Sequence, residues 1–211
     1  MKQLNQFITE YIIKKKLDTP IDSEDHYEYH PKSKDELKKN IIECIKNDKY
    51  DLNCIDTSKI TDMSYLFGSL NNVPIQSINF DVSEWDVSNV KRMGFMFNNC
   101  KNFNCDLSNW DVSNVNTMER MFYGCEIFEG KGLENWNVSN VDNMSNMFYN
   151  CKKFDCDLSN WNISNVKFME RMFYNCKKFK VDCLENWKIT TKVSKKNIFY
   201  GTKNTPSWYK K

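Results

Sequence analysis

The chain has 211 residues, with 30 basic and 28 acidic side chains, 14% aromatic residues and no alanine. With hydrophobic residues at 40% it is too apolar for a disordered chain, yet it contains no apolar run of the roughly 18 residues that could cross a membrane. Lysine outnumbers arginine 27 to 3, and asparagine occurs 28 times. Because A/T-rich codons encode lysine and asparagine, we infer an AT-rich genome, such as that of a small parasitic bacterium, a phage or a giant virus.

Residues 1–17 predict an amphipathic helical arm, joined to the rest of the chain by a polar linker at 18–32. Its apolar side chains recur at helical spacing: Leu4, Phe7, Ile8, Tyr11 and Ile12. Three interpretations of the arm stay open, namely docking on a partner, packing on the protein's own flank and contact with a membrane. The arm lacks the apolar core and cleavage site of a signal peptide, so we expect a cytoplasmic or intracellular protein with reduced cysteines.

The next segment, 33–54, predicts an N-terminal cap. Ser33 followed by Glu36 forms a capping box at the start of a helix over 33–46. One apolar stripe runs along that helix: Leu37, Ile41, Ile42 and Ile45. We expect the helix to cover the first repeat, because the end of a repeat array otherwise exposes its core.

Repeats of about 25 residues occupy 55–200. Five tryptophans, spaced 25, 26, 25 and 26 residues apart, lead the units: Trp85, Trp110, Trp136, Trp161 and Trp187. The phrase WDVSNV opens two units and becomes WNVSNV and WNISNV in the next two. Each then places two methionines, a phenylalanine, a cysteine and a second phenylalanine in fixed order. Such a unit cannot bury its apolar face alone, so stacking is expected.

Within a unit, Leu107, Trp110 and Val112 predict a short strand. A spacing of three and four predicts one face of a short helical turn, and its residues are Val115, Met118, Met121 and Cys125. A recurrent turn that tolerates positive φ is expected at the slot shared by asparagine and glycine: Asn99, Gly124, Asn150, Asn175 and Gly201.

The predicted fold class is therefore a leucine-rich-repeat-like solenoid of short strands, turns and short helical arms. The absence of alanine, the best helix former, disfavours an array of helical repeats. Residues 201–211 are expected to form a C-terminal cap, with Trp208 and Tyr209 as the lid opposite the N-terminal helix.

The phrase W-D-V-S-N-V-x-x-M-x-x-M-F-x-x-C-x-x-F resembles the repeats of BspA-like leucine-rich-repeat proteins, and most of all the variant first described in mycoplasma surface lipoproteins. IDTSKITDMSYLF at 55–67 resembles the opening unit of that family. The resemblance implies a solenoid without catalytic residues. Family members include surface adhesins and many intracellular and phage-encoded proteins. This chain lacks a signal peptide and a lipoprotein cysteine near its start, which opposes surface display.

Several residues invite a catalytic or metal-binding interpretation. The recurring cysteines are Cys100, Cys125, Cys151 and Cys176, which we expect to be small core residues, although stacked neighbours could come close enough for a disulfide. Cys105 and Cys156 are expected to be more exposed, with a possible redox role.

We expect no metal, no cofactor and no enzymatic activity. No Cys or His spacing fits zinc, and His26 and His30 lie in the linker. Asp86 and Asp111 are interpreted as turn residues rather than as a glycosidase-type carboxylate pair.

Exposed columns are the candidate partner-binding residues. The tyrosines are Tyr123, Tyr149, Tyr174 and Tyr200, and the lysines just past the turn are Lys152, Lys153, Lys177 and Lys178. The alternative is an amphipathic rim that only covers the edge of the core. Residues 152–211 carry 14 basic and 5 acidic side chains, net +9, whereas the rest is net −7. An acidic partner or head-to-tail contact between copies would suit this asymmetry.

The expected function is therefore a non-enzymatic protein–protein interaction or assembly scaffold, in the form of a phage or giant-virus virion accessory or structural protein. The expected partners are proteins, including copies of the chain itself or a viral particle. Small-molecule substrates, nucleic acid and membranes are not expected, the last two because arginine is scarce and no apolar span exists. The alternatives are a cell-surface adhesin-like repeat protein and, with no residue pattern in its favour, a hydrolytic enzyme.

Overall fold

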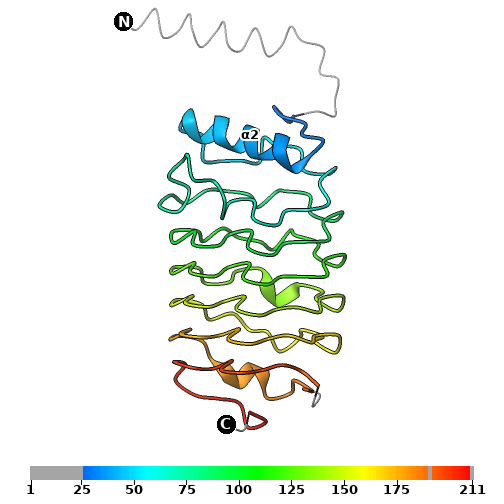
Figure 1. The fold of residues 1–211 in the computed structure, drawn as a ribbon, viewed down its shortest axis with the longest axis vertical. Coiled ribbons are helices and arrows are strands. Elements are labelled where there is room, and N and C mark those ends of the chain that lie inside the picture. The colour runs from blue at the N-terminus through cyan, green and yellow to red at the C-terminus, as the bar shows by residue number, and fades with distance from the viewer. Residues whose placement is uncertain (1–25, 190–191, 210–211) are drawn as a thin grey trace, which may run out of the picture.

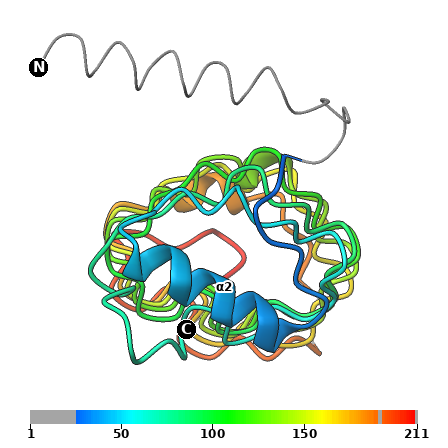
Figure 2. The same cartoon turned by 90° about the horizontal axis from the view of Figure 1, so that it is seen from above.

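A computed structural model describes residues 26–189 and 192–209. These residues form a column of stacked layers, with helix α2 (Lys34–Lys46) across one end and the C-terminal loop at the other (Figure 1). Viewed along the column, the layers superpose on one closed outline, and α2 crosses it (Figure 2). The predicted arm at 1–17 lies outside the described residues, as does most of the linker.

The prediction of a strand-based, leucine-rich-repeat-like solenoid is wrong. Within the described residues the structure has one α-helix, the short 3-10 helices η1 (Leu133–Asn135) and η2 (Val181–Leu184), and no strand or sheet. Successive layers meet instead in isolated parallel bridges. One chain of bridges runs down the column: Asp62, Arg92, Thr117, Asn143, Phe168 and Ser194.

The bridges do not extend into strands because the chain turns immediately after them. In a parallel sheet a strand offers both N–H and C=O groups to one neighbour in alternation. Here Arg120 and Phe122 donate their N–H groups to the next layer, at Ser145 O and Met147 O, both within 3.0 Å. The residues that alternate with these donors close β-turns instead, as Met121 N does to Met118 O (3.1 Å) and Tyr123 N to Arg120 O (3.2 Å). We call this run of alternating interlayer bonds and turns the ladder face.

Left-handed backbone at two slots per layer produces the ladder face. The asparagine and glycine slot is confirmed as a positive-φ turn, with φ of 61° at Asn99 and 72° at Gly124. A second slot carries larger side chains at positive φ, including Phe95 (60°), Arg120 (52°) and Arg171 (53°). Residues of this size seldom adopt that conformation. Asn146 and Asn197 (57° each) share the slot, but its mixed residue types do not mark it as a left-handed position. This second slot is why the layers are made of turns rather than strands.

The local strand and helix predictions also fail, although the predicted inward face is right. Leu107 and Trp110 belong to one turn, closed by Trp110 N to Leu107 O (3.2 Å), and not to a strand. The spacing from Val115 to Cys125 gives consecutive turns rather than a helical turn. All the apolar residues of these two motifs are nevertheless buried.

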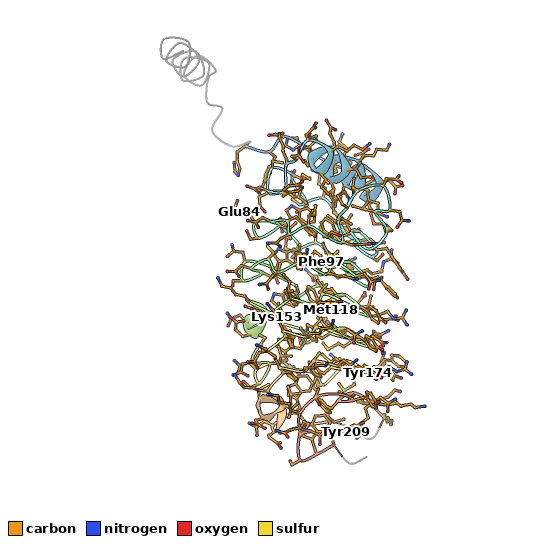
Figure 3. All side chains as sticks on the ribbon, turned by 90° about the vertical axis from the view of Figure 1, so that its left-hand side faces the viewer. Glu84, Phe97, Met118, Lys153, Tyr174 and Tyr209 are labelled. Atoms are coloured by element: carbon orange, nitrogen blue, oxygen red, sulfur yellow. The ribbon has the colours of Figure 1, made fainter. Side chains whose placement is uncertain are left out.

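The core consists of continuous aromatic columns along the axis of the stack. Phe122, Phe148 and Phe173 are fully buried and stack nearly parallel, with ring centroids 5.8 and 5.6 Å apart. A second column of phenylalanines runs beside the first, so that Phe154 lies 4.1 Å from Phe148. In Figure 3 the labelled Phe97 and Met118 lie in the interior, whereas Tyr174 lies at the edge of the column. Bulky side chains thus fill each layer.

Buried polar groups of the core bond to the preceding layer. The Trp136 Nε1–H donates to Leu107 O (3.2 Å), and the Trp161 Nε1–H to Leu133 O (2.7 Å). Trp208 continues this series with a bond to Leu184 O (2.8 Å), so the C-terminal loop adds a tryptophan to the column. Each such bond satisfies a buried carbonyl that would otherwise be costly.

Both ends of the apolar column are covered. Ser33 caps α2 by accepting a hydrogen bond from Glu36 N (3.2 Å), at the start of the helix predicted over 33–46. The helix buries Leu37 and Ile41 against the first layer. At the other end, Tyr209 meets the last core ring, Phe199, edge-on at 5.2 Å. No helix in the described part of the chain is long and apolar enough to cross a membrane.

Candidate interaction surface

The predicted tyrosine slot forms a stacked row of rings on the side of the column. Tyr123, Tyr149 and Tyr174 lie nearly parallel, with centroids 4.6 and 4.5 Å apart. Tyr200 extends the row at 4.6 Å and is 60% exposed. Each ring follows a buried phenylalanine and precedes a left-handed residue, so the layer spacing places it directly on the ring of the preceding layer.

The row continues toward the N-terminal end through residues that the sequence analysis missed. Tyr65 stacks on Phe95 at 4.3 Å, and both occupy the second left-handed slot rather than the tyrosine slot. Arg120 joins the two series, because its guanidinium carbon lies 5.1 Å from the Phe95 centroid and 5.9 Å from that of Tyr123. Because the row passes from one repeat position to another, comparing residues at a single repeat position does not reveal that it is continuous.

We call these residues the aromatic column. Its members are Tyr65, Phe95, Arg120, Tyr123, Tyr149, Tyr174 and Tyr200. It runs along the layers from the first repeat to the last. Burial raises the pKa of the Tyr174 hydroxyl, and the neighbouring Tyr149 and Tyr200 add to that rise. The Tyr174 hydroxyl therefore stays protonated and able to donate a hydrogen bond at neutral pH.

The other predicted contact residues divide into two groups. Lys152, Lys153, Lys177 and Lys178 are all exposed, three and four residues past their tyrosines. Lys152 is engaged in an ion pair with Glu126 (2.5 Å), and its hydrogen bond lowers the pKa of Glu126. The five apolar residues of the predicted arm, from Leu4 to Ile12, lie outside the described residues.

The two aspartates weighed as catalytic carboxylates serve the backbone instead. Asp86 Oδ1 accepts from Ser88 N (2.9 Å), and Asp111 Oδ1 accepts from Ser113 N (2.9 Å). Hydrogen bonds from Ser113 lower the pKa of Asp111. A general acid needs the opposite shift, so this carboxyl is suited to holding the turn.

The remaining candidates form no metal centre in the described residues. His30 Nδ1 lies 3.5 Å from Asp56 Oδ2, and the His26 ring stacks on Tyr27 at 4.8 Å. Cys105 is buried rather than exposed, and its thiol donates to Asp81 Oδ1 (3.3 Å). Cys156 is half-buried.

The recurring cysteines are free thiols inside the core. Cys125 donates its S–H to Phe97 O (3.1 Å), and Cys151 to Phe122 O (3.0 Å), so each thiol bonds to the preceding layer. Burial raises the pKa of Cys100 to about 12 and that of Cys125 and Cys151 well above the ordinary value. The thiolate needed for nucleophilic or redox chemistry is therefore scarce at neutral pH.

We expect the thiols of Cys100, Cys125, Cys151 and Cys176 to be unreactive in the folded protein. At about pH 8 a thiol-specific dye should label them at least about a hundredfold more slowly than in urea, since burial removes both access and thiolate. Cys54, which is only half-buried, provides the internal control. Mass spectrometry of labelled peptides locates each adduct. Equal labelling of Cys125 and Cys54 in the folded state would contradict the arrangement.

Comparison with known proteins places the chain in a family. A single family model matches it over residues 36–136 and again over 125–210, which together cover most of the chain. The model is described as "Mycoplasma protein of unknown function, DUF285". The chain belongs to this family. The first match begins within α2, and the second extends past Tyr209, the last described residue. No curated protein and no solved structure matches the chain.

Proposed function

We propose that the protein is a non-enzymatic protein–protein interaction or assembly module, and that the aromatic column is its contact surface. The observation that carries this proposal is the row of stacked rings from Tyr65 to Tyr200, which forms two runs with spacings near 4.5 Å that are joined by Arg120. The rings at its two ends, Tyr65 and Tyr200, are exposed, and the rings between them are half-buried. Tyrosine and arginine are the residues most often found at energetically important contacts. Because the rings already support each other, a partner orders few side chains on binding.

The setting of this module is also a proposal. The recurring phrase at Trp110 and Trp136 supports the repeat variant first described in mycoplasma surface lipoproteins, and the Mycoplasma origin of the family description agrees with it. The scarcity of arginine and the absence of alanine support an AT-rich genome. We favour an intracellular or virion-associated protein, as a phage or giant-virus structural accessory.

A surface adhesin is the second candidate, favoured by the same repeat phrase. Fractionation separates the two candidates. The first predicts that the protein copurifies with a particle or with intracellular proteins. Accessibility to an antibody on intact cells would support the adhesin and contradict the first.

The contact surface is tested by affinity capture with the full chain as bait. The double variant Tyr149→Ser/Tyr174→Ser removes two adjacent rings, and we expect captured partner to fall about tenfold or more, as for interface aromatics. Phe168→Ser is the matched control, because Phe168 is 46% exposed but lies outside the aromatic column. If the double variant kept its melting temperature and captured as much partner as the unmodified chain, the aromatic column would only cover the edge of the core and would not be the contact surface.

The predicted arm is tested in the same assay. Deleting residues 1–17 should leave the melting temperature nearly unchanged. If the arm docks on the partner, capture is lost along with it. A fall in melting temperature would show instead that the arm packs on the repeats.

A further inference from the structure

Within the described part of the chain, the ladder face ends in a row of backbone N–H groups without hydrogen-bond partners. In the penultimate layer the N–H groups of Arg171 and Phe173 donate to Lys196 O and Ile198 O, at 3.0 Å each. The corresponding N–H groups of the last layer have no hydrogen-bond partner among the described residues. These donors belong to Lys195, Asn197, Phe199 and Gly201. They repeat at every second residue and should point in one direction, as their counterparts do in every layer above.

An open pocket of about 1140 Å³ lies over these donors. The four donor residues line it together with the side chains of Lys196 and Lys203. The C-terminal loop, which Figure 1 shows below the last layer, covers the core through Tyr209 but leaves this edge open. The pocket is therefore a built feature of the end of the column, with its own donors and cations.

The donor row selects its ligand by geometry. The edge of an ordinary β-strand presents N–H and C=O groups in alternation. If such a strand lay against the donor row, some of its N–H groups would face the N–H groups of the row. The row needs acceptors only. A second copy could present the outward carbonyls of its first layer, but α2 covers that end and Lys34 Nζ already contacts Ser64 O (3.3 Å).

An extended acidic peptide satisfies this requirement. Its alternate side chains lie on one side, so carboxylates at every second residue present a row of acceptors to the row of donors. Carboxylate bonds to backbone N–H groups are charge-assisted and strong. Residues 152–211, which include the pocket, have a net charge of +9. Nucleic acid fits less well, since this segment holds a single arginine, Arg171, for phosphate recognition.

We propose that this terminal pocket binds a segment of a protein partner with acidic residues at alternate positions. The partner's carboxylates accept hydrogen bonds from the four N–H groups, and Lys196 and Lys203 supply the surrounding positive charge. Asp182 also lines the pocket and repels an anion at that edge. Tyr200, the last ring of the aromatic column, also lines this pocket, whereas Tyr123, Tyr149 and Tyr174 do not. The four backbone donors lie outside the aromatic column, so variants of Tyr149 and of the pocket lysines separate this proposal from the function proposed above.

The first test compares synthetic peptides in binding to the full chain. The probes are a labelled (Glu-Gly) repeat of about ten residues, its (Gln-Gly) counterpart and a block isomer with the same charge but no alternation. We expect the alternating acidic peptide to bind about tenfold more tightly than either control. An oligothymidylate that binds as tightly as the alternating peptide would make the pocket a general polyanion site and overturn the proposal.

Variants locate the binding. Lys196→Glu/Lys203→Glu should weaken the alternating peptide about tenfold or more, whereas Asp182→Asn should tighten it. The control, Lys59→Glu, reverses an exposed charge on the first repeat and should change affinity by less than about twofold. Tyr149→Ser should also leave this affinity unchanged, which separates the terminal pocket from the aromatic column. If Lys59→Glu weakened peptide binding as much as the pocket variant, the loss of affinity would reflect the net charge of the protein alone, and the proposal would be overturned.

Amide hydrogen exchange reports on the donors themselves. Without peptide, the amides of Lys195, Asn197 and Gly201 should exchange faster than those of Met169, Arg171 and Asn175, their paired counterparts. Saturation with the alternating peptide should slow exchange at the terminal donors. Binding without any such slowing would place the peptide elsewhere and refute the site.

Discussion

Phe148→Ala should lower the free energy of unfolding by about 3–5 kcal/mol, the range for a phenylalanine removed from a packed core. Phe148 has no exposed surface and lies between Phe122 and Phe173 in the central column. Its ring also packs at 4.1 Å against Phe154. Backbone hydrogen bonds between the layers, including Phe148 N to Met172 O (2.9 Å), fix the distance between them. The neighbouring layers therefore cannot move together to close the cavity that the substitution leaves.

Urea titration monitored by tryptophan fluorescence measures this loss. Phe168→Ala provides the matched control, because it removes the same side chain from a position that is 46% exposed, and it should change stability by less than about 0.5 kcal/mol. Since each layer contacts only its neighbours, Phe148→Ala should also reduce the slope of the transition as the two halves begin to unfold separately. A loss below about 1 kcal/mol would mean that the column tolerates a gap.

Gly132→Ala should destabilise the fold by about 3 kcal/mol, combining left-handed strain with overpacking. Gly132 has φ of +93°, and an added Cβ would lie 2.2 Å from Ser108 N and 2.6 Å from Leu107 C. Both are backbone atoms of the preceding layer. They are held by the bond from Leu107 N to Lys131 O (3.1 Å), so neither side can move alone.

Gly94→Ala is the matched glycine control. Its Cβ would meet its nearest neighbour, Glu119 O, at 3.4 Å, and its φ lies outside the left-handed region. We expect it to be neutral or to stabilise by about 0.4–1 kcal/mol, because alanine restricts the unfolded chain. Thermal melts of the two variants side by side measure the difference. A Gly132→Ala protein as stable as Gly94→Ala would contradict the close approach of these layers.

The sequence predicts that the repeats stack in layers, but not the path of the backbone within a layer. Tryptophans spaced by 25 and 26 residues and apolar residues at fixed slots predict layers with a common core, and those residues are buried. Asn99 and Gly124 reveal one left-handed slot, because their residue types tolerate positive φ. The second left-handed slot is not apparent at Phe95 and Arg120, since these residue types seldom adopt positive φ. The prediction of a helical turn from Val115 to Cys125 failed at this second slot, at Arg120, where tertiary stacking overrides local preference.

The candidate site was likewise predictable only in part. The tyrosines share one repeat position, so the sequence alone places Tyr123 and Tyr149 next to each other. Tyr65 and Phe95 join them only through Arg120, which requires the three-dimensional arrangement of two slots. The terminal pocket was hidden altogether, because it consists of main-chain groups and arises where the repetition stops.

The ladder face also has an electrical consequence for the molecule as a whole. Four peptide groups in a layer, from Met118 to Gly124, direct their N–H bonds toward the C-terminal end, and successive layers repeat that direction. The opposing bonds from Asn116 N to Lys91 O and from Ile127 N to Lys101 O cancel only part of it. Aligned peptide dipoles add, as they do along a helix, but here the positive pole lies at the C-terminal end. That end also carries the excess of lysine, so backbone and side chains polarise the column in the same sense. In the electric field of a negatively charged surface, the protein is therefore expected to orient before contact, with its C-terminal end toward that surface.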